Sequence, residues 1–170
     1  MSQQRRDALD DAYEPTDARP TNRRELGLGA IGGAVATVAM TAFRMPISRS
    51  LPPTGPFLAK YLGGEPGDYG WEALALHLGY GTAAGGVFGG LAARALGATT
   101  PDGDCGSEAG REARATALGV AYGLALSAFG VRVLLGRALG VDLDPDERLV
   151  FHLSHVVYGL TLGTWFGSNV

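Results

Sequence analysis

The sequence has few charged residues and almost no cysteine, and each shortage excludes a class of protein. Asp, Glu, Lys and Arg make up 18% of its 170 residues, against about a quarter in an average soluble domain. Cys105 is the single cysteine, so the chain cannot be an internally cross-linked disulfide scaffold. The formal net charge of −3 gives no reason to expect nucleic acid as a partner. An ordinary soluble domain is therefore not the first interpretation.

The charges that are present leave four long stretches without any. Asp, Glu, Lys and Arg are missing from the windows 26–43, 73–93, 115–131 and 149–170. A helix needs about 20 mostly apolar residues to cross the core of a bilayer, and each window is close to that length. A soluble bundle, the alternative, would carry charges every few residues on its outer face. The sequence therefore predicts an all-α fold, an integral membrane four-helix bundle.

The windows and their flanks divide the chain into four parts. A polar tail over 1–25 is predicted to be disordered, because it offers almost nothing apolar to bury. The remaining parts are a transmembrane hairpin over 26–93, a flexible loop over 94–114 and a second hairpin over 115–170. With their polar ends included, the expected spans are 26–43, 73–93, 115–136 and 146–168.

The positively charged residues predict the orientation of the spans, because Lys and Arg concentrate in cytoplasmic loops. The tail holds five and the middle loop three, whereas the first and last loops hold three each. Arg23 and Arg24 also adjoin the first span. We therefore expect a multi-pass protein of the cell (inner) membrane with both termini in the cytoplasm. The tail lacks the basic start and apolar core of a cleavable signal peptide, so the first span is expected to direct insertion.

The second and fourth spans repeat each other. Residues 77–89 read HLGYGTAAGGVFG, residues 155–167 read HVVYGLTLGTWFG, and both fit H-x-x-Y-G-x-x-x-G-x-x-F-G. The matched His, Tyr and Phe carry this signal, since the chain has few residues of these types. The bundle is therefore predicted to consist of two pseudo-repeated hairpins of the same orientation, related by an axis along the membrane normal.

The first and third spans match each other in either of two registers, and the sequence does not choose between them. One register pairs Gly29, Gly33 and Thr37 with Gly119, Gly123 and Ser127. The other pairs Thr41-Ala42-Phe43 with Ser127-Ala128-Phe129.

Glycines recur every four residues in the spans, which places them on one face of each helix. Small residues at this spacing let helix backbones approach closely in a membrane. The helix-packing glycines predicted in this way are Gly29, Gly33, Gly81, Gly85, Gly89, Gly119, Gly123, Gly159, Gly163 and Gly167. Bulky Leu, Val and Phe side chains would then face lipid. Such a glycine zipper could also join copies of the chain, so the expected partners are the bilayer and a homo-oligomer.

The three histidines all lie in expected spans, where ionisable residues are costly and often functional. His152 and His155 are three residues apart and are expected to share one helix face. Together with the neighbouring tyrosines the histidines form a candidate polar cluster of His77, Tyr80, His152, His155 and Tyr158. The favoured interpretation is hydrogen bonding between helices. The alternatives are proton or solute movement in a small oligomeric channel or carrier, and ligation of a metal or haem. No HExxH motif occurs, and none of the four uncharged windows contains a carboxylate. We therefore expect no catalytic residue, no cofactor and no enzymatic activity. Whether the histidines bind a metal is left open.

The loops carry three helix-start signals. Thr54, with Pro56 in the first turn, predicts a short helix in the proline-rich first loop. Asp144, followed by Pro145 and two acidic residues, predicts the N-cap of the fourth span. The middle loop is expected to become helical from about Ser107.

The glycine-rich first span, the Pro52-Pro53 loop and the H-x-x-Y-G-x-x-x-G segments together resemble the YagU-like family of uncharacterised polytopic inner-membrane proteins. The resemblance covers roughly residues 26–168. It implies an integral inner-membrane protein, and it implies no functional residues.

Overall fold

The computed structural model describes residues 23–47, 54–98 and 107–170, which are almost entirely helical and contain no β-strand. Three shorter segments accompany four long helices. In chain order the elements are α2 (Arg23–Arg44), α3 (Thr54–Leu62), the 3-10 turn η1 (Pro66–Tyr69), α4 (Gly70–Ala98), α5 (Glu108–Phe129), the π-helix η2 (Gly130–Leu139) and α6 (Pro145–Asn169).

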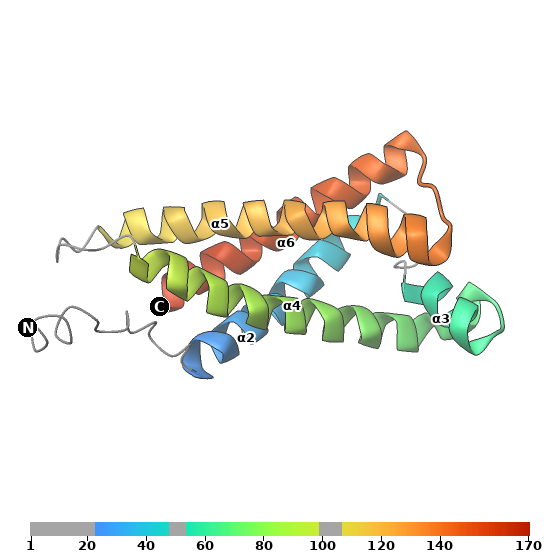
Figure 1. The fold of residues 1–170 in the computed structure, drawn as a ribbon, viewed down its shortest axis with the longest axis horizontal. Coiled ribbons are helices and arrows are strands. Elements are labelled where there is room, and N and C mark those ends of the chain that lie inside the picture. Colours follow the sequence, from blue (N-terminus) through green and yellow to red (C-terminus); the bar gives the residue numbers. More distant parts are fainter. Residues whose placement is uncertain (1–22, 48–53, 99–106) are drawn as a thin grey trace, which may run out of the picture.

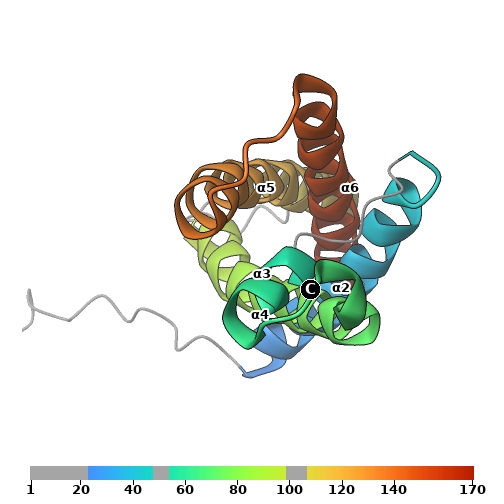
Figure 2. The same ribbon diagram turned by 90° about the vertical axis from the view of Figure 1, so that its right-hand side faces the viewer.

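The four long helices run along the long axis of the molecule in two antiparallel pairs (Figure 1). The first pair is α2 with α4 and the second is α5 with α6, and α2 also packs against α6. By contrast, α4 and α5 contact each other at few positions. The short helix α3 lies at the end where α4 begins and η2 finishes, and the C-terminus lies at the opposite end (Figures 1 and 2).

Several expected boundaries are corrected by the structure. Arg23 to Glu25, assigned to the disordered tail, already belong to α2. Most of the expected flexible loop over 94–114 is helical, since α4 continues to Ala98 and α5 begins at Glu108. Residues 1–22 of the tail and 99–106 of the loop lie outside the described residues. The polar residues at these helix ends can be helical because their charged side chains project into solvent or headgroups.

The three helix starts predicted from the loops lie at the expected positions, but within the described ranges the side chains of Thr54 and Asp144 do not make the expected capping hydrogen bonds. α3 begins at Thr54, yet the Thr54 hydroxyl donates to the carbonyl oxygen of Ala73 at 2.8 Å and so ties α3 to α4. Asp144 is the N-cap of α6, but its carboxylate accepts no capping hydrogen bond from the described residues of the helix. Ser107 caps α5, where its hydroxyl accepts a bond from the backbone N–H of Gly110.

Three helical segments among the described residues are long and apolar enough to cross a membrane. They are Arg23–Arg44, Glu108–Leu139 and Pro145–Asn169. The expected second span, within α4, is not one of them, although α4 has 29 residues. Its many glycines, together with His77 and Tyr80, lower its mean hydropathy.

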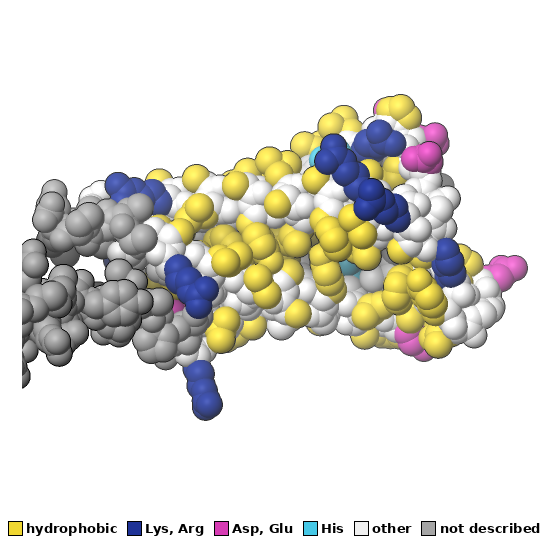
Figure 3. Space-filling model, viewed as in Figure 1, with side chains coloured by type: hydrophobic (Ala, Val, Ile, Leu, Met, Phe, Trp, Pro, Cys, Tyr) yellow, Lys and Arg dark blue, Asp and Glu magenta, His cyan; other side chains and the backbone are white. Residues whose placement is uncertain are grey.

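The outer surface is apolar along the middle of the molecule. Hydrophobic side chains fill the centre of the face in Figure 3, and charged side chains gather toward its two ends. Exposed Val and Leu occur on every long helix, including Val38, Leu91, Leu124 and Leu160. Many Val and Leu side chains therefore face outward, as predicted, but Leu135 and Leu162 are buried. The prediction is wrong for Phe88, Phe151 and Phe166, which are also buried.

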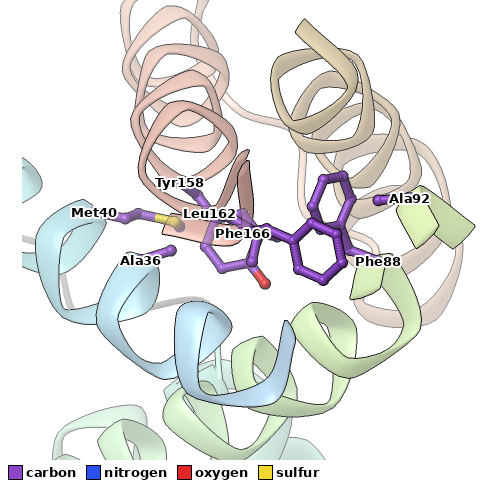
Figure 4. Close-up of a cluster of buried hydrophobic side chains, with 7 residues drawn as sticks. All are labelled: Ala36, Met40, Phe88, Ala92, Tyr158, Leu162 and Phe166. Atoms are coloured by element: carbon purple, nitrogen blue, oxygen red, sulfur yellow. The ribbon is translucent and has the colours of Figure 1, made fainter. Parts of the chain in front are cut away.

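The buried core lies between α2, α4 and α6 (Figure 4). The rings of Phe88 and Phe166, the matched phenylalanines of the two hairpins, meet edge to face with centroids 5.6 Å apart. Leu162 packs beside them with no exposed surface. α5 reaches this core through Tyr122, whose hydroxyl donates to the carbonyl oxygen of Ala84 at 2.8 Å. The two hairpins therefore share one hydrophobic core.

Candidate functional site: a histidine-lined cavity in the helix bundle

The helices of each pair meet backbone to backbone at the predicted glycines. A methyl group added at Gly33 would overlap the carbonyl oxygen of Gly81 and lie 2.8 Å from the Cα atom of Gly85. In the second pair, a methyl group at Gly119 would overlap the carbonyl oxygen of Gly159 and lie 2.8 Å from the Cα atom of Gly163. Such close approach leaves no room for any larger side chain.

All ten predicted glycines are used in this way inside one chain. An added methyl group at any of them would come within 3 Å of an atom of a neighbouring helix. Their faces are therefore covered by the chain itself. A homo-oligomer formed through them would require the hairpins to separate.

A cavity of about 210 Å³ opens where the glycine contacts end, on the side where α4 faces η2. Its polar lining residues are Thr54, His77, Tyr80 and His155. The rest of the lining is apolar or glycine and comes from five elements besides α4. A pocket of this kind, mostly apolar with a few convergent polar groups, is typical of a small-molecule site.

A smaller chamber of about 20 Å³ adjoins this cavity deeper in the bundle. Thr37, His77, Tyr80, His155 and Tyr158 supply its polar lining. The chamber thus collects the matched histidines and the matched tyrosines of both hairpins. A volume of this size holds about one oxygen-sized group and needs two to four polar partners around it.

The structure brings together four of the five members of the predicted polar cluster and separates the fifth. His152 lies against α5, where its Nδ1 atom is 2.7 Å from the hydroxyl oxygen of Ser127. His152 lines neither the cavity nor the chamber. The spacing of three residues therefore does not bring His152 and His155 into one site. The ring of His152 contacts Ser127, whereas the ring of His155 contacts the carbonyl oxygen of Phe151.

The hydrogen bonds of the cluster differ from one residue to the next. Tyr158 donates to the carbonyl oxygen of Gly81 at 2.7 Å, which links the two hairpins. The Nδ1 atom of His155 lies 2.8 Å from the carbonyl oxygen of Phe151. Because a carbonyl only accepts, this nitrogen carries the proton and the Nε2 atom of a neutral His155 ring is an acceptor. The side chains of His77 and Tyr80 make no hydrogen bond to any other described residue, so both have polar atoms to offer a ligand.

A rare helix type forms one wall of the cavity. Over η2 the chain is a π-helix, a form that usually occurs as a single turn and often at functional sites. It presents Gly130, Leu134, Leu135 and Leu139 to the cavity. The segment ends at Gly140, whose φ of 70° favours glycine. Because a π-helix has a wider turn than an α-helix, Leu134, Leu135 and Leu139 lie on one surface of this segment.

The short helix α3 closes the outer end of the cavity. Phe57 contributes its ring to the lining, and the Nζ atom of Lys60 donates to the carbonyl oxygen of Ala138 on η2 at 2.6 Å. Sequence reasoning missed these residues and the η2 leucines. No local signal identifies them, because Phe57 and Leu135 lie 78 positions apart in the chain and meet only through the fold.

No group of three His, Cys, Asp or Glu residues in the described ranges lies close enough to hold a metal ion. The candidate site is therefore a pair of histidines, His77 and His155, with two tyrosines.

The chain matches no protein-family model, no curated protein and no solved structure. The resemblance to the YagU-like family therefore stays a prediction.

Proposed function

We propose that the protein is a polytopic protein of the cell (inner) membrane that has four spans and acts by binding a small molecule rather than by catalysis. Both termini would lie in the cytoplasm. The cavity beside His77 and His155 is the observation that carries the binding role, because its lining is mostly apolar and includes a small set of convergent polar side chains.

α4 is the proposed fourth span. Its 29 residues extend over about 43 Å at 1.5 Å per residue, which exceeds a hydrocarbon core of about 30 Å. Between Glu72 and Arg94 it carries no charged residue. It lies antiparallel to α2, a candidate span, and Val87 and Leu91 expose apolar surface on its outer side. Because α4 packs backbone to backbone against α2, we expect both helices to lie in the bilayer.

The two hairpins are proposed to be repeats, and the glycine contacts favour one of the two registers left open by the sequence. Gly33 meets Gly81 and Gly85, whereas Gly119 meets Gly159 and Gly163. Since these partners are the matched glycines of the second and fourth spans, Gly33 corresponds to Gly119. The same register aligns Thr41-Ala42-Phe43 with Ser127-Ala128-Phe129, which supports a duplicated hairpin.

A small channel or carrier is the second candidate function, because His77 and His155 face one chamber. A solute that crossed the bundle would have to pass the core beyond that chamber. There Phe88, Leu162 and Phe166 are at most 2% exposed. This packing favours binding over passage.

The native cysteine provides the test of membrane insertion and orientation. A membrane-impermeant maleimide is expected to leave Cys105 unlabelled in intact cells and to label it after the membrane is opened. In a Cys105→Ser background, Asp142→Cys, at a position whose side chain is fully exposed, is expected to show the opposite pattern. Labelling of both sites from outside, or extraction of the protein by alkaline carbonate, would contradict the proposal.

A further inference from the structure

We propose that the cavity binds one neutral amphiphile with an oxygen-containing head, drawn sideways from the lipid phase. Its hydroxyl or carbonyl oxygen occupies the small chamber between His77 and His155, and its hydrocarbon body lies between α4 and η2. The inference rests on the proposed membrane insertion, because the opening described below then faces lipid.

The size and lining of the cavity define the body of the ligand. A dry apolar cavity of about 150 Å³ is enough for a benzene ring, and this one holds about 210 Å³. Leu76 of α4 and Leu134 and Leu135 of η2 contribute apolar walls. The space therefore suits a single medium-length hydrocarbon chain or one ring, and it is too small for a two-chain phospholipid.

The opening lies between α4 and α5, two neighbouring helices that pack loosely. α2 and α6 contact each other along much of their length, whereas α4 and α5 do so at few positions. The cavity occupies the resulting gap at the end where α5 passes into η2. Its sides there are apolar, and the end facing the loops is covered by Thr54 and Phe57 of α3. A molecule from the membrane interior reaches such a site more directly than one from water.

The chamber at the inner end defines the head group. The Nε2 atom of a neutral His155 accepts a hydrogen bond, because its Nδ1–H is used by the carbonyl oxygen of Phe151. The Tyr80 hydroxyl can donate, and His77 can donate through one ring nitrogen and accept through the other. A hydroxyl group can donate to His155 and accept from Tyr80 or His77, whereas a carbonyl oxygen can only accept from Tyr80 or His77.

The charges around the chamber favour a neutral head over a carboxylate. None of the residues that line the cavity or the chamber is Asp, Glu, Lys or Arg. Arg44 interacts electrostatically with His77 and His155 without lining either space, and Glu147 interacts with Arg44 in turn. Burial of an anion without a dedicated partner costs far more than burial of a hydroxyl with hydrogen bonds.

The test titrates 1-decanol into the full-length protein in phospholipid nanodiscs and records the side-chain ¹⁵N signals of its histidines. The three signals are assigned with single His→Gln variants. We expect a saturable shift at His77 and His155 and none at His152, whose Nδ1 atom is held by Ser127 outside the cavity. Decane and decanoate serve as probes of the same chain length without a neutral oxygen head.

One matched pair of variants and one further variant locate the site. Leu126→Phe fills a position that lines both the cavity and the chamber and is expected to weaken decanol binding about tenfold. Leu124→Phe, on the same helix but 45% exposed, is expected to leave it unchanged. Tyr80→Phe keeps the ring and is expected to weaken binding about fivefold, the effect of one lost hydrogen bond.

Each outcome of the wild-type titration is decisive. Saturable shifts at His77 and His155 with decanol alone support the proposal. Equal shifts with decane would overturn the assigned head group, and tighter binding of decanoate would overturn its neutrality. The absence of a saturable shift in protein that is correctly inserted in nanodiscs would overturn the site itself. Failure of the protein to enter nanodiscs would instead contradict the membrane proposal.

Discussion

Substitution of Gly85 by alanine tests the backbone contact between α2 and α4. The added methyl group would overlap the carbonyl oxygen of Gly29 and lie 2.8 Å from the backbone nitrogen of Gly33. These are backbone atoms, which cannot rotate away as a flexible side chain would. The helices must therefore separate by roughly an ångström along this contact. The matched control is Gly79→Ala on the same helix, where the methyl group meets nothing within 4 Å.

The expected loss of stability follows from two opposing contributions. Replacing glycine by alanine inside a helix stabilises it by about 0.8–1 kcal/mol. Overpacking costs about 1–3 kcal/mol, and contact with rigid backbone puts Gly85 at the upper limit. We therefore expect Gly85→Ala to destabilise the protein by about 2 kcal/mol. Gly79→Ala should stabilise it by up to about 1 kcal/mol, so the two variants differ by about 3 kcal/mol.

Reversible unfolding in mixed micelles of a mild detergent and sodium dodecyl sulfate, followed by circular dichroism, measures this difference. Gly163→Ala in the second hairpin provides an independent check, because its methyl group would lie 2.6 Å from the carbonyl oxygen of Ala115. It should destabilise by a similar amount. If Gly85→Ala and Gly79→Ala unfold within about 0.5 kcal/mol of each other, the argument from backbone contact is refuted.

Three further predictions concern the polar groups. Tyr158→Phe removes the buried hydrogen bond to the carbonyl oxygen of Gly81 and should destabilise the protein by about 1–2 kcal/mol in the same assay. The control Tyr80→Phe should change the stability by less than about 0.5 kcal/mol, and equal effects of the two variants would contradict the hydrogen bond between the hairpins. Ser127→Ala should shift the ¹⁵N signal of His152 and leave the other two histidine signals in place, and a shift at all three would contradict the separation of His152 from the chamber. Elemental analysis and an absorption spectrum of the purified protein should find no stoichiometric metal and no haem band, and either signal would make the histidine pair a ligand set.

The sequence was sufficient for the features that depend on local spacing. Helical glycine spacing identified the residues at which helices meet, and α2, α5 with η2, and α6 coincide with three of the four uncharged windows. The H-x-x-Y-G pattern identified His77, Tyr80, His155 and Tyr158, which the fold collects in one chamber. Short-range signals succeed here because helix faces are fixed by residues three and four apart.

The sequence was insufficient where the outcome depends on a distant partner. Thr54 was expected to act as a cap, but its hydroxyl is used by Ala73, 19 residues away. His152 was grouped with His155 by spacing, and only the position of α5 gives it a separate partner in Ser127. The π-helical form of η2 has no recognised sequence signature, so the cavity wall that it forms could not be predicted.

The cavity follows from a departure of the second hairpin from the first. In the register favoured by the glycine contacts, Arg44 at the end of α2 corresponds to Gly130, where α5 passes into η2. α2 ends at that point, whereas the second hairpin continues as a π-helix that finishes at Leu139. If the hairpins were identical, α4 would pack against α5 as closely as α6 packs against α2. The π-helix and the reduced contact between α4 and α5 occur together beside the histidines, so the site is located where the second hairpin departs from the proposed repeat. Replacement of η2 by a regular helical end should therefore close the cavity and leave the glycine contacts of both hairpins intact.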